Sequence, residues 1–480
     1  MLALRENDFR HKLFYAAAAA FTAFMAVCLF YRQPYIPLLI PGLFFVAWIA
    51  FHHLDKLMMA TAFLTPVSVN IGDIGLGLGL SLPAEPLIFG MMLVLILNLA
   101  AGGKLDPKIL KHPVTLLIGF HLLWMMITTL FSTMILVSVK ATIARLAFTM
   151  VFYLLAAHVF AGFKNIRRFF WLYISTLIFV IGYGVQGWMA GGMTKNAAHS
   201  SMAPFYSDHT VYAAVISLLM FPLIAFMADS RYSRKWKIMA LPVALWLITG
   251  LITSYSRAAW ISVAAALAIS LIFLFRIRTW MVWAVSLLIV GYVVFSWTDI
   301  IIKLESNTED SSSDYREHLQ SISNISTDAS NVERVNRWLC ALRMFNEKKL
   351  FGWGPGTYQF QYAPFQHYDE RTIISTNFGE VGSSHSEYLG PLSEQGLPGM
   401  ILFMLIGILV FVKASKYILT TENKSGKIIA IGIVLGLSTY YIHGFLNYFL
   451  DTDNASVPFW GSLAALTALQ VYHKDSSGNS

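Results

Sequence analysis

Long apolar stretches follow one another along almost the whole chain, and short polar segments separate them. Each stretch has roughly 17–25 residues, enough for an α-helix to cross the hydrocarbon core of a bilayer. The stretches lack the polar face that a helix at the surface of a soluble protein needs. We therefore predict an all-α integral membrane protein with about fourteen transmembrane helices. These spans are expected at 13–31, 35–51, 57–71, 84–101, 114–134, 140–161, 168–188, 209–228, 238–255, 258–275, 280–297, 398–413, 428–447 and 455–472.

The span at 57–71 has the weakest pattern, because Pro66 and Asn70 interrupt it. The distribution of Lys and Arg tests whether it should be counted, since basic residues concentrate in cytoplasmic segments. With about fourteen spans and both termini in the cytoplasm, most Lys and Arg lie on the cytoplasmic side. Without the span at 57–71, the basic clusters at 229–237 and 413–427 would lie outside. We therefore expect all fourteen spans, with both termini cytoplasmic.

Composition agrees with this class of protein and excludes others. The 480 residues are 57% hydrophobic and 12% charged, with a mean hydropathy of +0.61, whereas soluble domains have about 25% charged residues. Cytoplasmic Lys and Arg explain the net charge of +8, so we expect no nucleic-acid partner. The two cysteines, Cys28 and Cys340, offer neither a disulfide framework nor a metal cluster.

One long polar segment, 298–397, divides the chain into an N-terminal transmembrane bundle (1–297) and a C-terminal part (398–480) with the last spans and a short cytoplasmic tail. Acidic residues outnumber Lys and Arg in this segment, and long loops are exempt from the positive-inside count, so we place it on the outer face. Within it, 305–331 is polar and rich in serine, which is typical of a mobile segment. Residues 332–397 carry aromatics and glycines and are expected to fold.

The folded part of the loop begins with a predicted amphipathic helix, because apolar residues from Val332 to Phe345 recur at helical spacing. Glu333 lies four residues before Arg337, so we expect a surface ion pair between them. This pairing leaves Arg334 as the cation available to a ligand. The sequence from 351 to 358, FGWGPGTY, then predicts a tight turn.

A second candidate lies at 383–389, SSHSEYL. Ser384 and Glu387 have the spacing of a capping box, which would place His385 in the first turn of a short helix. The positive end of a helix dipole disfavours an imidazolium, and a neutral imidazole is what a general base requires. A purely structural histidine is the alternative interpretation.

A third candidate is Arg257, at the outer turn between two spans. Arginine at this depth is costly and usually functional, and its guanidinium can bind a phosphate through two hydrogen bonds. The alternative is an arginine that reaches the lipid headgroups. Lys140 and Arg145, near the outer end of another span, are candidates for the same basic pocket. The pair Asp208–His209 is expected to be a helix cap at the interface, and a second polar pair is the alternative interpretation.

Several motifs resemble those of the O-antigen ligase and O-antigen polymerase superfamily of bacterial envelope glycosyltransferases, over about residues 200–450. They are the S-R-small-small-W turn (Ser256–Trp260), the R-x-x-x-W motif (Arg334, Trp338), the glycine turn (Phe351–Tyr358), the H-S-x-Y-L segment (His385–Leu389) and the E-x-G-x-x-G motif (Glu394, Gly396, Gly399). The chain departs from the family pattern at Ser386, where Asn is most frequent, and at Ala258, where Gly is common.

The resemblance implies a GT-C-like helical bundle in the bacterial inner membrane, with its active site facing the periplasm. It also implies an undecaprenyl-pyrophosphate-linked glycan donor, a glycolipid or glycan acceptor, an inverting reaction, and no metal or other cofactor. By position, Arg257 and Arg334 match the arginines that hold the pyrophosphate, and His385 matches the histidine that activates the acceptor hydroxyl. Further substrate-binding candidates are Arg145, Lys140, Arg337, Tyr388, Glu387 and Trp260.

Three functions remain open at this point. We favour an O-antigen ligase with lipid A–core or a similar acceptor, and a polysaccharide polymerase that uses the same chemistry is the first alternative. A lipid-linked oligosaccharide flippase or transporter, from another class, should show repeated halves and polar residues near the membrane midplane. In this chain the polar candidates gather on the outer side instead. A structural scaffold would explain neither Arg257 nor His385.

Overall fold

The computed structural model describes residues 36–72, 79–274, 329–371, 375 and 382–474, together with Thr22 and Met25. Apart from Thr22 and Met25, the expected spans at 13–31 and 280–297 and the serine-rich residues up to 328 lie outside these described residues. The chain divides into two compact units, Met1–Leu57 and Met58–Ser480. In the first unit the structure describes α2 (Ile36–His52), which matches the span expected at 35–51.

Seven helical segments of the described residues are long and apolar enough to cross a membrane, and all seven coincide with expected spans. Six of them are single helices: α6 (Pro113–Leu130), α9 (Phe163–Ala190), α11 (His209–Ala228), α12 (Arg234–Thr253), α19 (Leu389–Thr420) and α20 (Lys424–His443). The seventh is continuous from 135 to 159 and consists of α7 (Ile135–Thr149), a π-helical turn (Met150–Leu155) and α8 (Ala156–Val159). Three further helices match the expected spans near 84–101, 258–275 and 455–472: α4 (Ala84–Ala100), α13 (Arg257–Leu274) and α21 (Asp453–Tyr472). The helical membrane fold is therefore confirmed, and the total of fourteen spans and their orientation stay predictions.

The segment expected to span at 57–71 has a different structure. Helix α3 (Leu54–Leu64) is followed by a 3-10 turn (Thr65–Val67) and by strand β1 (Val69–Ile71). This strand pairs antiparallel with β2 (Leu80–Leu82) in a small hairpin. Eleven helical residues extend about 16 Å, roughly half of the hydrocarbon thickness. The prediction of one continuous helix over 57–71 is therefore wrong, and a crossing of the membrane by this segment stays a prediction.

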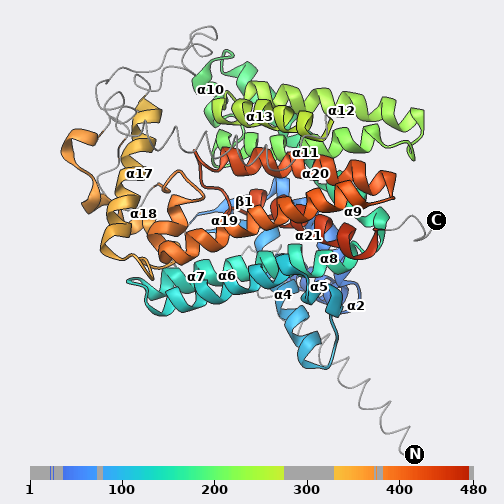
Figure 1. Ribbon diagram of the computed structural model, residues 1–480, viewed down its shortest axis with the longest axis horizontal. Coiled ribbons are helices and arrows are strands. Elements are labelled where there is room, and N and C mark those ends of the chain that lie inside the picture. The colour runs from blue at the N-terminus through green and yellow to red at the C-terminus, as the bar shows by residue number, and fades with distance from the viewer. Residues whose placement is uncertain are drawn as a thin grey trace, which may run out of the picture. The chain divides into compact units, whose positions relative to one another are not determined.

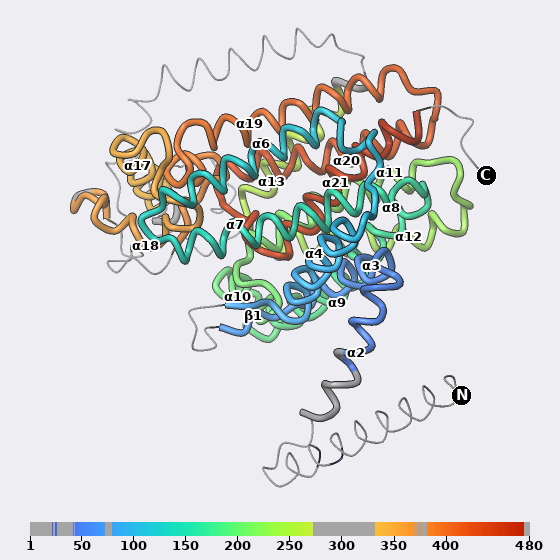
Figure 2. Tube along the Cα trace, turned by 90° about the horizontal axis from the view of Figure 1, so that it is seen from below, coloured from blue at the N-terminus to red at the C-terminus, as the bar shows by residue number. Residues whose placement is uncertain are grey.

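Helices α11 and α20 form the centre of the second unit (Figure 1). They run antiparallel, because Gly432 lies against Ala225 and Gly436 lies against Leu218. Glycines make this close packing possible, because a Cβ at Gly436 would overlap the carbonyl oxygen of Leu218. Most residues of both helices are buried. Helices α12 and α13 lie on one side of this pair, and α19 packs along α6 on the other (Figures 1 and 2).

The described part of the long loop is folded at one end of this bundle, against the beginning of α19 (Figure 1). It contains α17 (Ala329–Glu347), α18 (Tyr358–Gln361) and two 3-10 turns (Ala363–Phe365 and Tyr368–Glu370). Its own small core comprises Cys340, Ala341, Met344, Tyr358 and Tyr362. The predicted amphipathic helix is confirmed as α17. Two short helices complete the described elements, α5 (Pro107–Leu110) and α10 (Lys195–Ser200).

Candidate active site

The segment 444–452, which we name the α20–α21 linker, fixes the chain around His385. The backbone N–H of Glu387 donates to the carbonyl oxygens of Gly444 (2.8 Å) and Asn447 (3.1 Å). The Oε1 atom of Glu387 accepts hydrogen bonds from the Tyr440 hydroxyl (2.6 Å) and from the backbone N–H groups of Phe449 (2.7 Å) and Leu450 (2.9 Å). Glu387 is buried, and this burial raises its pKa. Glu387 therefore holds the linker in place through Oε1, and its role as a substrate ligand stays a prediction.

The predicted capping box is wrong, because the linker takes the Glu387 carboxylate. Ser384 donates to the carbonyl oxygen of Ser386 (3.1 Å). It is Ser386 whose hydroxyl accepts from the backbone N–H groups of Tyr388 and Leu389 at the beginning of α19 (3.3 and 3.4 Å). His385 therefore lies four residues before the helix, not in its first turn.

The backbone of His385 is held in an unusual conformation, with a positive φ of 49°. Such a conformation is costly for a residue other than glycine and persists only where surrounding contacts enforce it. Here the backbone N–H donates to the hydroxyl of Ser383 (3.3 Å), and the carbonyl oxygen accepts from the indole of Trp338 (3.2 Å). The orientation of His385 thus depends on α17 and on its own segment.

Two arginines of α17, Arg334 and Arg337, act electrostatically on His385. Burial lowers the pKa of the His385 imidazole to about 4, and the positive charges of these arginines add to the effect, whereas Asp208 and Glu333 oppose it. The imidazole is therefore neutral at physiological pH. The expected neutrality has a different cause from the predicted one, since burial and arginine charge replace the helix dipole.

Arg334 is anchored to the linker, where its Nε donates to the carbonyl oxygen of Leu446 (3.2 Å). Four residues later, Trp338 binds the carbonyl oxygen of His385. Residues four apart share one face of a helix, so the R-x-x-x-W motif directs a cation and an indole toward the same place. This spacing links the linker, α17 and His385 in one arrangement.

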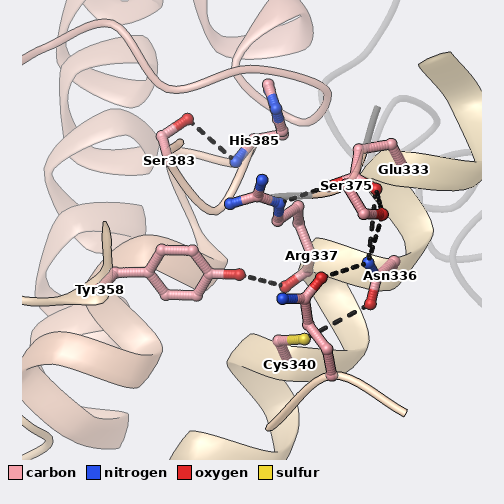
Figure 3. Close-up of polar contacts among 9 residues, drawn as sticks. Glu333, Asn336, Arg337, Cys340, Tyr358, Ser375, Ser383 and His385 are labelled. Carbon is pink, nitrogen blue, oxygen red and sulfur yellow. Dashed lines mark hydrogen bonds and ion pairs between the residues drawn. The ribbon is translucent and has the colours of Figure 1, made fainter. Parts of the chain in front are cut away.

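The predicted pair between Glu333 and Arg337 is confirmed, with 2.6 Å between Oε1 and Nε, but it is not on the surface. The two side chains are only 6% and 4% exposed. The Arg337 guanidinium also lies over the ring of Tyr362, at 3.9 Å from its centroid. Figure 3 shows the polar contacts of Arg337 with Glu333 and with Tyr358, whose hydroxyl donates to the carbonyl oxygen of Arg337 (2.8 Å). Arg337 therefore contributes its charge from within a structural network.

Arg257 begins α13, directly after the buried residues Tyr255 and Ser256. This turn lies at the end of α12 that packs on the beginning of α11, because Gly250 is close to the hydroxyl of Tyr212. Arg257 is therefore at the end of the bundle where α11 begins, on a different element from His385 and Arg334. Trp260 binds the carbonyl oxygen of Leu251 through its indole (3.1 Å), a contact that joins α13 to α12.

Three other substrate-binding candidates lie elsewhere or have structural partners. Arg145 forms an ion pair with Asp451 of the linker (2.7 Å), and its side chain is only 8% exposed. Lys140 is half-buried on the same helix, α7. Tyr388 donates to the carbonyl oxygen of Tyr441 (2.9 Å) and stacks on Phe445. The ion pair with Asp451 offsets the charge of Arg145. A basic pocket shared by Arg145, Lys140 and Arg257 stays a prediction.

The glycine turn fastens the loop to the membrane helices. The carbonyl oxygen of Trp353 accepts from the backbone N–H of Thr133, in the α6–α7 turn (3.1 Å), and the N–H of Gly354 donates to the carbonyl oxygen of Glu394 (2.8 Å). Gly354 has a φ of +112°, and a Cβ there would overlap the hydroxyl of Ser132. The predicted tight turn is confirmed.

The E-x-G-x-x-G motif marks a bend inside α19. Gly396 has a φ of +69°, and a Cβ there would overlap the carbonyl oxygen of Leu350 in the loop. The N–H of Leu397 donates to the carbonyl oxygen of Lys349 (2.9 Å). The indole of Trp124 donates to the carbonyl oxygen of Gln395 (2.8 Å). The loop residues Lys349 and Leu350 therefore pack against the bend, and Lys349 is hydrogen-bonded to it.

Residues 242–404 match the O-antigen ligase family. We call this matching segment the O-antigen ligase domain. The resemblance seen in the sequence is therefore confirmed, and the family is one of ligase- and polymerase-type glycosyltransferases with lipid-linked glycan substrates in a membrane. No curated protein sequence matches the chain. The O-antigen ligase domain contains Arg257, Arg334 and His385 but ends before the linker.

Two residues outside the O-antigen ligase domain, Asp208 and His443, lie near the candidate site. The sequence analysis did not assign either of them to the site of His385 and Arg334. Asp208 is the N-cap of α11, as expected, and its carboxylate also pairs with His209 (2.9 Å). His443, the last residue of α20, is 1% exposed, and within the described chain neither of its ring nitrogens has a hydrogen-bond partner. Only the antiparallel packing of α11 on α20 brings these residues together, so sequence spacing carries no signal of it.

Proposed function

We propose that this chain is a membrane glycosyltransferase that moves a glycan from undecaprenyl pyrophosphate to an acceptor hydroxyl on the periplasmic side of the bacterial inner membrane. The observation that carries the proposal is the neutral imidazole of His385 beside the guanidinium groups of Arg334 and Arg337, inside an O-antigen ligase domain. A neutral imidazole can accept a proton, and two arginines can bind a diphosphate.

The chemistry assigns a role to each group. The acceptor oxygen attacks the anomeric carbon while the bond from that carbon to the phosphate oxygen breaks, so the configuration inverts. The acceptor proton passes to His385, and the electron pair of the broken bond goes to the diphosphate, where Arg334 stabilises the growing negative charge. Diphosphate is a good leaving group, so the scheme needs no pair of carboxylates of the kind that glycoside hydrolases use. Arg257 is assigned to the same diphosphate, from the beginning of α13.

We favour the ligase reaction, with lipid A–core or a similar glycolipid as acceptor. A polymerase would use the same donor and the same residues, with a second lipid-linked repeat as acceptor. The proposed orientation, with both termini in the cytoplasm, follows from the Lys and Arg distribution. A flippase would move the donor without forming a glycosidic bond.

The test is transfer by the purified, reconstituted chain, with a defined lipid-linked glycan and either core acceptor or further donor alone. Transfer to core identifies a ligase, and elongation without core identifies a polymerase. His385→Ala and Arg334→Ala should each lower transfer by about 10²-fold or more. His367→Ala is the matched control, because this histidine of the same loop is 60% exposed. Wild-type turnover by His385→Ala would exclude the proposed base.

A further inference from the structure

A carboxylate outside the O-antigen ligase domain lies close enough to His385 to act on its charge. Asp208 accepts hydrogen bonds from the backbone N–H of Thr210 (2.9 Å), from the Thr210 hydroxyl (2.8 Å) and from Nδ1 of His209 (2.9 Å). Burial disfavours its charge, but the hydrogen bonds from His209 and Thr210 outweigh burial and keep the pKa of Asp208 below its usual range. Asp208 is therefore an anion at physiological pH, and its side chain is 44% exposed.

Helix packing explains how this carboxylate reaches the site. Helices α11 and α20 run antiparallel and touch where Gly436 meets Leu218. His443, the last residue of α20, lies seven residues after Gly436, and the first turn of α11 lies about seven residues before Leu218. The antiparallel packing therefore places His443 beside the beginning of α11. The linker starts immediately afterwards, and its first residues bind the segments that carry His385 and Arg334. This packing places Asp208 near His443, at the end of α20 from which the linker starts, and the linker binds the segment that carries His385.

The charges that face His385 make an added anion useful. Arg334, Arg337 and Glu333 come from α17, and Asp208 comes from the beginning of α11. Glu333 is engaged by Arg337, Asn336 and Ser375. The arginines favour binding of a diphosphate, but they also make a positive charge on His385 more costly. Asp208 opposes them from a separate element.

We propose that Asp208 is a positioning residue for transfer, whose carboxylate stabilises the imidazolium that forms when His385 takes the acceptor proton. In this step the acceptor O–H bond breaks and an N–H bond forms on His385, while Asp208 keeps its charge and takes no proton. The inference rests on the proposed function and adds to it a residue from the first half of the chain. It also gives the Asp208–His209 pair a role beyond capping α11.

The capping role can be separated from the charge, because Asn and Ser cap helices as well as Asp does. Asp208→Asn and Asp208→Ser therefore keep the cap and remove the carboxylate, and Asp208→Glu restores the charge. The matched control is Asp106→Asn. Asp106 caps α5 through the backbone N–H of Lys108 (2.8 Å), at the same spacing, and it binds Tyr472 at the far end of α21.

The experiment measures initial rates of glycan transfer by the reconstituted full-length chain between about pH 5 and 8. We expect Asp208→Asn to lower kcat, because the imidazolium of His385 loses a stabilising charge. The expected decrease is about tenfold for each unit by which the His385 pKa falls. KM for the lipid-linked donor should not rise, because removal of an anion cannot weaken diphosphate binding. Asp208→Glu should recover most of kcat, and Asp106→Asn should match the wild type.

Wild-type kcat in Asp208→Asn would overturn the inference, and so would a rise in donor KM without a change in kcat. If Asp208→Asn lowers the thermal unfolding midpoint, kcat is measured for Asp208→Ser instead. Wild-type kcat in Asp208→Ser would also overturn the inference. Failure of the proposed function has a different signature, because His385→Ala would then keep its activity whatever Asp208 does.

Discussion

The indole of Trp338 donates a hydrogen bond to the carbonyl oxygen of His385, at 3.2 Å, across 47 residues of sequence. One turn earlier on the same helix, Arg334 donates to the carbonyl oxygen of Leu446. Helix α17 therefore positions a cation and, through an indole, the proposed base. This relationship gives the R-x-x-x-W motif a physical meaning.

The first prediction concerns that indole. Trp338→Phe keeps an aromatic ring and removes the hydrogen bond, which contributes about 0.5–1.5 kcal/mol. We expect kcat for glycan transfer to fall by about 2–10-fold with little change in donor KM, because His385 is displaced while Arg334 stays. The control is Trp353→Phe, which removes an equivalent bond to the carbonyl oxygen of Met344 (2.9 Å) in the same loop. Equal kcat values for the two variants would contradict this role of Trp338.

The second prediction concerns the stability of the linker. Glu387→Gln replaces a buried carboxylate oxygen that accepts three hydrogen bonds with a neutral amide. The free energy of unfolding should fall by about 1–3 kcal/mol, because the amide is a weaker acceptor. Thermal unfolding of the detergent-solubilised protein measures this change. The exposed Glu422→Gln is the control, and equal unfolding midpoints for the two variants would be the contrary result.

The third prediction is the pH dependence of transfer. Burial and the two arginines lower the pKa of His385 to about 4, and the neutral form is the proposed base. Because kcat/KM reports the ionisation of the free enzyme, it should stay level from about pH 8 to 5 and fall toward pH 4. The control, His367→Ala, should have the same profile. A half-maximal value near pH 6.5, the ordinary histidine pKa, would contradict the burial of this imidazole.

The same shift affects stability in a defined direction. In the unfolded chain the pKa of His385 returns to about 6.5, so the unfolded state binds the proton first as the pH falls. The contribution of His385 to stability is therefore fully present above about pH 6.5 and decreases between there and about pH 4. In His385→Ala this part of the acid-induced loss of stability should be absent.

Features that depend on length and local pattern could be predicted from the sequence. Apolar runs of the right length located α2 and the long apolar helices from α4 onward, and helical spacing located α17, because each signal lies within one segment. The prediction of one continuous helix over 57–71 failed because residues 69–71 pair with 80–82, and local hydropathy does not indicate such pairing. The capping box failed for a similar reason, since Glu387 is bound by residues more than fifty positions away.

The candidate site was predictable only in part, for a related reason. His385, Arg334 and Arg257 could be found because their motifs are local. The partner of Arg145 is Asp451, 306 residues later, and Asp208 reaches the site through helix packing alone. Charged residues that only tertiary packing brings together have no characteristic spacing in the sequence. The partner of Arg145 and the position of Asp208 near the site could therefore not be predicted from a single sequence.

The fourth prediction concerns the attachment of the loop to the membrane helices. Gly354→Ala should prevent correct docking of the glycine turn, because the added Cβ would overlap the hydroxyl of Ser132 and φ is +112°. The control is Gly192→Ala, at a φ of +76° but with no atom within 4 Å of the new Cβ. Both variants carry backbone strain of about 1–3 kcal/mol, and only Gly354→Ala adds a clash. We therefore expect limited proteolysis to cleave the loop of Gly354→Ala alone, with loss of transfer. Equal protease resistance and equal transfer in the two variants would show that the turn does not fasten the loop.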